Sequence, residues 1–184
     1  MVKDINPVIR VAEDSLCDSF PHSFKEFNNY LYFVADDGIG GEELWKTNGT
    51  YSGTVLVKNI NASDSSSPKF LTAGSSRLFF YANDGINGLE LWSTTGTAES
   101  TQMIKNINLP EQISSSQPVI VGSYCYFTAD DGNGLEIWRT DGTVENTSLI
   151  IDGTSSNPRN LISAFGSLYF TADTSSGTYL FSFN

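Results

Sequence analysis

The chain has 184 residues, of which 39% are apolar and 12% aromatic, enough to bury a core within one domain. Its 10 basic and 21 acidic residues give a formal net charge of −11, which would repel a phosphate backbone, so nucleic acid is not an expected partner. No apolar run approaches the roughly 20 residues that a membrane span needs, and the N-terminal residues lack the apolar stretch of a signal peptide, so we expect no membrane insertion.

The first predicted strand lies at the N-terminus, in residues 1–6. Its sequence VKDI, Val2 to Ile5, matches VKNI, Val57 to Ile60, further along the chain. In the later copy this segment is the last strand of a repeat. We therefore expect residues 1–6 to be the last strand of a repeat whose other strands lie elsewhere in the chain.

The next unit, residues 21–60, shows the pattern of a four-stranded sheet. A short segment after Pro21 is followed by the aromatic run YLYFVA, the segment EELWKT and the segment VLVKNI. The breaks between these runs, DDGIGG and TNGT, contain the Asp-Gly and Asn-Gly pairs that favour tight turns. No segment has a sustained period of 3.6 residues, so the unit is predicted to be all β.

The units at 68–107 and 115–152 repeat this pattern. The repeat is clearest at Trp45, Trp92 and Trp138, which are spaced by 47 and 46 residues. Four short strands in a period of 40 to 50 residues are typical of a β-propeller blade. We expect each tryptophan to pack between neighbouring blades, where it would bury a large apolar area.

The fourth unit, residues 158–184, follows the pattern through SLYFTA to Phe181, which takes the place of the tryptophans, but has no last strand of its own. The sequence thus predicts one domain over 1–184, an all-β, four-bladed β-propeller with four antiparallel strands per blade, closed by the N-terminal strand. A monomer is favoured. The alternatives are part of a larger ring, a strand-exchanged dimer, or two chains that form eight blades.

Two cysteines are present, and they are not expected to pair. Cys125 lies in YCYF, where the parallel runs YLYF, RLFF and SLYF carry leucine, which indicates a small buried apolar side chain. We therefore expect a free thiol there and not a disulfide with Cys17.

Acidic residues recur between the second and third strands of the blades. The candidate ligand-binding residues are Asp36, Asp37, Asp84, Asp130, Asp131 and Asp173. The favoured interpretation is structural, because these carboxylates can accept backbone N–H groups within the loop. The functional alternative is a bound cation such as Ca²⁺, which prefers several oxygen ligands. No other cofactor is expected.

Catalysis finds little support in the sequence. His22 is the one histidine, and no nucleophile-elbow, zinc or phosphate-loop motif occurs. We expect no enzyme activity, and a carboxylate-based glycoside hydrolase stays as an alternative. The loops between blades differ most from one another, and the longest of them suggests a contact surface at Arg10, Glu13, Asp14 and Asp18.

The segments ELWKTNGT, ELWSTTGT and EIWRTDGT resemble the ELWxxDGT repeat proteins. Asn48 and Thr95 replace the aspartate of that motif. The resemblance implies propeller blades and an extracellular or cell-surface location, and no settled activity. We expect a non-enzymatic, lectin-like or other small-ligand binding module, with a carbohydrate or protein ligand. The alternative is a protein-interaction or adhesive module of a larger extracellular protein.

Overall fold

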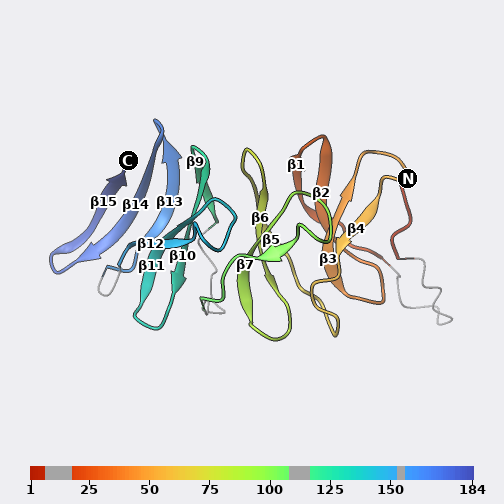
Figure 1. The fold of residues 1–184 in the computed structure, drawn as a ribbon, viewed down its shortest axis with the longest axis horizontal. Helices are drawn as coiled ribbons and strands as arrows, with labels where there is room; N and C mark the ends of the chain where they lie inside the picture. The colour runs from red at the N-terminus through yellow and green to blue at the C-terminus, as the bar shows by residue number, and fades with distance from the viewer. Residues whose placement is uncertain (7–17, 108–116, 153–155) are drawn as a thin grey trace.

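The computed structural model describes residues 1–6, 18–107, 117–152 and 156–184, and in these ranges the chain forms 15 strands in four antiparallel sheets. Figure 1 shows the sheets side by side in one row, in chain order. The described residues form no helix that is long and apolar enough to cross a membrane. The prediction of an all-β, antiparallel architecture is confirmed.

The strands of each sheet are hydrogen-bonded in chain order. Sheet 1 contains β1 (His22–Phe27), β2 (Tyr30–Asp36), β3 (Glu42–Thr47) and β4 (Val55–Lys58). Sheet 2 contains β5 (Lys69–Ala73), β6 (Leu78–Asn83), β7 (Leu89–Thr94) and β8 (Gln102–Met103). Sheet 3 contains β9 (Val119–Val121), β10 (Tyr124–Asp130), β11 (Leu135–Thr140) and β12 (Ser148–Ile151). Sheet 4 has three strands, β13 (Arg159–Ala164), β14 (Ser167–Thr174) and β15 (Gly177–Phe183).

The TNGT segment forms the turn between β3 and β4, as its sequence predicts. The Gly49 amide donates to the Thr47 hydroxyl at 3.0 Å, and the Thr50 amide donates to Asn48 Oδ1 at 3.1 Å. The hydroxyls of Thr47 and Thr54 lie 2.7 Å apart and link the two ends of the turn. Equivalent threonine pairs close the TTGT and TDGT turns. Side-chain hydroxyls thus replace the backbone partners that the turn residues lack.

Each sheet has two apolar faces, because successive residues of a strand point to opposite sides. We call the side that faces the preceding sheet the upstream face, formed in sheet 1 by Phe33, Ala35 and Trp45. The opposite side is the downstream face, formed in sheet 1 by Tyr32, Val34 and Leu44. Both faces of sheet 1 are buried, which explains why aromatic residues occur in adjacent positions of the sequence.

The core consists of the layers between neighbouring sheets. Trp92, on the upstream face of sheet 2, packs in one cluster with Tyr32, Val34 and Leu44 of sheet 1. Trp138 of sheet 3 packs in the same way in a cluster with residues of sheet 2. Both indoles are buried, and so is that of Trp45. The prediction that the tryptophans pack between sheets holds for Trp92 and Trp138, whereas Trp45 packs against Ile5 of the N-terminal segment.

The predicted closure of the ring is not seen. Sheet 4 has no fourth strand among the described residues, and the N-terminus lies at the far end of the row from the C-terminus (Figure 1). Residues 1–6 lie instead on sheet 1, where Ile5 packs against Phe33 and Trp45. A segment with the VKNI-type sequence can make two contacts: it can pair along the third strand of a sheet, and it can pack on the next sheet. Residues 1–6 pack on sheet 1, but they do not pair with β15, the third strand of sheet 4.

Two further predictions concern single side chains. Phe181 is opposite Phe170, as Trp45 is opposite Phe33, so it does stand at the tryptophan position. It remains 38% exposed, however, with its ring stacked on Phe170 at 5.6 Å. Cys125 is buried with a free thiol, as expected, and burial raises the pKa of that thiol. Cys17 lies outside the described residues.

Candidate functional site

The Asp-Gly hairpin between β2 and β3 uses its carboxylates to hold its own backbone. Asp36 Oδ1 accepts a hydrogen bond from the Gly38 amide at 2.6 Å. Asp37 Oδ1 accepts from the amides of Ile39 and Gly40 at 2.9 and 2.7 Å. The hairpins of all four sheets lie along one edge of the row (Figure 1). The contacts support the structural interpretation of these residues.

The other candidate aspartates also bond within their own sheet. Asp84, Asp130 and Asp131 each accept backbone amides of their hairpin. Asp173 differs, because both of its oxygens pair with the Arg159 guanidinium at 2.8 Å. The hydrogen bonds from Arg159 and then from Thr178 lower the pKa of the Asp173 carboxyl. The six aspartates therefore stay in four separate hairpins.

The described residues contain no group of three or more His, Cys, Asp or Glu side chains placed to share a metal ion. Calcium binding at the hairpins stays the untested alternative to the structural interpretation.

Removing the Asp37 carboxylate tests its structural role. Asp37→Ala should lower the free energy of unfolding by about 1 kcal/mol, because two backbone amides lose a charged acceptor that water replaces only in part. Asp37→Asn keeps an acceptor oxygen and should cost less. Urea titration followed by circular dichroism measures both. Equal losses in the two variants would mean that the charge, and not the hydrogen-bond acceptor, is what stabilises the hairpin.

Three glutamates that the sequence did not single out are buried in sheets 1 to 3: Glu43, Glu90 and Glu136. Each is opposite the alanine that ends an aromatic run. Glu43 accepts from the Asn61 amide at 3.1 Å and from the Ser66 hydroxyl at 2.6 Å. It thus fixes both ends of the segment that leads from sheet 1 to sheet 2.

Burial raises the pKa of Glu43 and of Glu136. The signal in the sequence was the glutamate of ELW and EIW, two residues before each tryptophan and so on the same side of the strand. A charged residue in an alternating strand is normally expected in solvent.

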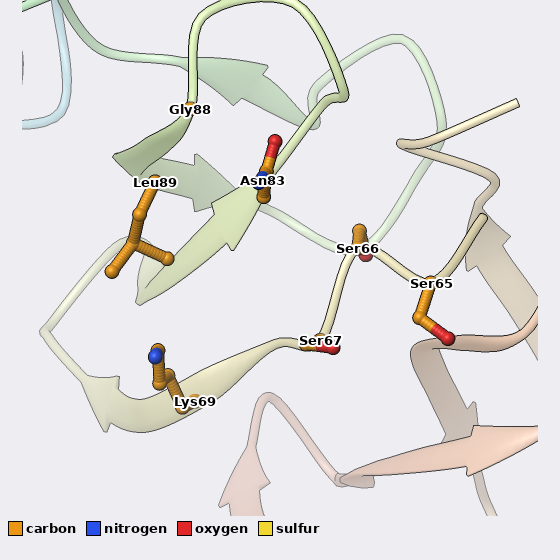
Figure 2. Close-up of a pocket in the computed structure, with 7 residues that line it drawn as sticks. All are labelled: Ser65, Ser66, Ser67, Lys69, Asn83, Gly88 and Leu89. Atoms are coloured by element: carbon orange, nitrogen blue, oxygen red, sulfur yellow. The ribbon is translucent and has the colours of Figure 1, made fainter. Parts of the chain in front are cut away.

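The segment fixed by Glu43 forms one wall of a pocket of about 220 Å³ (Figure 2). Its lining residues are Ser65, Ser66, Ser67, Lys69, Asn83, Gly88 and Leu89. The Ser66 carbonyl accepts the Asn83 amide at 2.9 Å, which ties the serine wall to β6. Figure 2 shows that the three serines lie on the segment before β5, while Asn83 and Leu89 enter from the hairpin opposite.

The cation in this pocket, Lys69, occupies a position that is also basic in sheets 1 and 4. Lys69 is opposite Tyr81 at the start of β5, as His22 is opposite Val34 and Arg159 is opposite Thr171. His22 Nε2 lies 3.2 Å from Glu42 Oε1, and Arg159 forms two hydrogen bonds with Asp173. Both of these basic groups therefore have a carboxylate partner.

Lys69 lacks such a partner in the part of the chain that the structure describes. Sheet 2 has Asn83 at the position of Asp173, and Leu89 at the position of Glu42. Lys69 forms no ion pair and no hydrogen bond with any described residue. The pocket thus combines an ammonium group that is unpaired within the described ranges with amide and hydroxyl groups. Sequence reasoning missed this pocket because Lys69 is recognised as unusual only after the structure shows that His22 contacts Glu42 and that Arg159 contacts Asp173.

The variable loops are described in part. Residues 63–68, in the variable loop between the first and second sheets, contain the serines of the pocket. Asp18 is described and exposed, whereas Arg10, Glu13 and Asp14 of the proposed contact surface lie outside the described residues. The contact surface stays a prediction.

Comparisons with known proteins give limited results. No protein-family model matches the sequence, and no curated protein is a match. Among solved structures, a mutant of puromycin hydrolase complexed with PGG matches with 12% identity and a TM-score of 0.39, over 89% of this chain and 37% of that protein. An α-L-arabinofuranosidase from Clostridium thermocellum matches with 13% identity and a TM-score of 0.40, over 85% of this chain and 61% of that protein. This chain thus spans less than two thirds of either protein, and the activity of neither is carried over to it.

Proposed function

We propose that the chain is a non-enzymatic, lectin-like binding module of the propeller type, and that the pocket around Lys69 takes a small polar ligand with a carboxylate, such as an acidic sugar. The observation that carries the proposal is Lys69 beside Asn83, without a carboxylate partner among the described residues. In sheets 1 and 4 the equivalent basic groups already contact a carboxylate of the protein. A ligand carboxylate would take that place in sheet 2.

The groups around Lys69 suit such a ligand. Asn83 Oδ1 accepts the Gly85 amide at 2.7 Å, which leaves the amide hydrogens of Asn83 to donate. A charge-assisted hydrogen bond from Lys69 and a second one from Asn83 would bind one carboxylate. Serine hydroxyls and the apolar Leu89 line the rest of the pocket, as the hydroxyl groups and the ring of a sugar require. The net charge of −11 disfavours polyanions, so a ligand with one charge fits best.

Isothermal titration with glucuronate and with glucose tests the proposal. Glucuronate should bind at least about tenfold more tightly, because a charge-assisted hydrogen bond contributes on the order of 1.4 kcal/mol or more. Asn83→Asp should abolish this preference, because it gives Lys69 a carboxylate partner like that of Arg159. The matched control is Asn48→Asp, which adds the same charge in a turn where the third repeat already has Asp141.

Two outcomes would contradict the proposal. If neither glucuronate nor galacturonate binds, the function assigned to the pocket is wrong. If glucuronate binds equally well to Asn83→Asp, the ligand occupies another site. Repeating the titration with Ca²⁺ and with EDTA tests the calcium alternative at the same time, because a required cation would make binding sensitive to EDTA.

The resemblance to the ELWxxDGT repeats supports one further proposal. We propose that the module acts outside the cell or at its surface.

A further inference from the structure

The N-terminal segment lies on sheet 1 in the same way as the end of one sheet lies on the next. Lys3 Nζ donates to the Thr54 carbonyl at 2.9 Å, and Lys58 Nζ donates to the equivalent Thr101 carbonyl at 2.8 Å. Ile5 packs on the upstream face of sheet 1, as Ile60 packs on the upstream face of sheet 2. The contacts of a preceding sheet are thus reproduced without that sheet.

A close approach between Asn6 and Gly38 also shows that residues 1–6 lie on sheet 1 as the end of sheet 1 lies on sheet 2. A Cβ on Gly38 would lie 2.5 Å from Asn6 Oδ1, and one on Gly85 would lie 2.8 Å from Asn61 Oδ1. Both glycines have positive φ, of 77° and 79°. The site on sheet 1 is therefore shaped for the last strand of another sheet, and residues 1–6 occupy it.

At the other end of the row, sheet 4 lacks a following sheet to cover its downstream face in the described structure. Leu180 of β15 is 69% exposed, whereas its equivalents Leu44, Leu91 and Ile137 are 0%, 2% and 0% exposed. In the other sheets this position is covered by the upstream face of the following sheet. The downstream face of sheet 4 is uncovered in the described structure, and β15 has no strand on its outer side.

The upstream face of sheet 1 is covered only in part by residues 1–6. A cavity of about 220 Å³ remains there, and its lining includes Val2, Ile5, Phe24 and Phe33. Phe24 is exposed and stacks on Phe33 at 6.0 Å. At each interface inside the chain, a surface of this type packs against a downstream face. The chain therefore presents both halves of its own internal interface, one at each end of the row.

We propose that a second copy of this chain occupies both ends. Sheet 4 of one copy would pack on sheet 1 of its partner, and residues 1–4 of the partner would pair along β15. Because the two ends lie at opposite sides of the row (Figure 1), a pair of copies forms this contact twice about a two-fold axis. The pair is a closed ring of eight sheets, which is within the range known for propellers.

Disulfide trapping tests which chains are joined. The register of β3 and β4 places Leu44 opposite Lys58, so Leu180 should be opposite Lys3 of the partner. In a Cys17→Ser background, Lys3→Cys combined with Leu180→Cys should give a covalent dimer of about twice 20.1 kDa on non-reducing gels. A disulfide within one chain would mean that four sheets close on themselves, and would overturn the proposal.

Sedimentation of the unmodified chain gives an independent measurement. We expect the mass of two copies, and dissociation to one copy in Leu180→Asp. Leu180 is exposed in the single chain, so this variant should fold. The control Val144→Asp adds a charge at another exposed apolar position and should leave the pair intact. A mass of one copy for the unmodified chain, or of more than two, would overturn the proposal.

Discussion

Replacing Trp92 by alanine should lower the free energy of unfolding by about 3–5 kcal/mol, the range expected when a large aromatic side chain is removed from a core. The indole is buried between sheets 1 and 2, in a cluster that includes Tyr32 and Leu44. Its Nε1 also donates to the Ala82 carbonyl at 3.1 Å. Truncation leaves a cavity that two β-sheets cannot close without losing their hydrogen bonds. Urea titration followed by circular dichroism measures the loss.

The fourth repeat provides the matched control. Phe181 stands at the position of Trp92 in its own sheet but is 38% exposed. Phe181→Ala should therefore cost less, about 1 kcal/mol, since more than a third of the residue's surface is already in water. Similar losses for the two variants would show that the buried layer between sheets 1 and 2 does not dominate the stability, which would contradict the packing described above.

The second large effect concerns pH and Glu43. Burial raises the pKa of this carboxyl more than its hydrogen bonds from Ser66 and Asn61 lower it. The native state therefore holds a proton at pH values where the unfolded chain has released it. The contribution of Glu43 to stability should be fully present below the ordinary glutamate pKa, and should be lost as the pH rises from there through the raised pKa of the native state. Glu43→Gln cannot ionise, so this part of the decrease should disappear.

Unfolding midpoints in urea between about pH 4.5 and about pH 7.5, a range that spans the ordinary glutamate pKa and neutrality, measure this effect. The control is Glu26→Gln, which removes an equal charge from an exposed position on β1. This variant reports the general relief of repulsion in an acidic protein. If both variants flatten the pH dependence to the same extent, net charge and not the burial of Glu43 is responsible.

Much of the architecture could be predicted from the sequence because it is repeated. Alternating apolar residues and Asp-Gly or Asn-Gly pairs specify strands and tight turns locally, and three copies make the pattern unambiguous. The position of Trp92 between sheets followed from its recurrence in each repeat. The turn around Asn48 followed from its residue types alone. These features depend on neighbours that are close in sequence.

The features that were missed depend on contacts between distant residues. Glu43 was not recognised because its partners, Asn61 and Ser66, lie in another segment and make a buried carboxylate tolerable. Lys69 is recognised as unusual only when it is compared with the equivalent basic residues of sheets 1 and 4, which contact carboxylates. Residues 1–6 were predicted to pair with sheet 4 but lie on sheet 1. Their sequence suits both contacts, and the sequence alone does not show which of the two is formed.

The uncovered downstream face of sheet 4 has a consequence for biosynthesis. Each sheet is covered by the sheet that follows it in the chain, so during translation the most recently completed sheet always exposes an apolar face. Sheets 1 to 3 expose theirs only until the next repeat emerges. In the described structure sheet 4 leaves Leu180 exposed. An apolar face that no sheet covers is prone to aggregation until another surface packs against it.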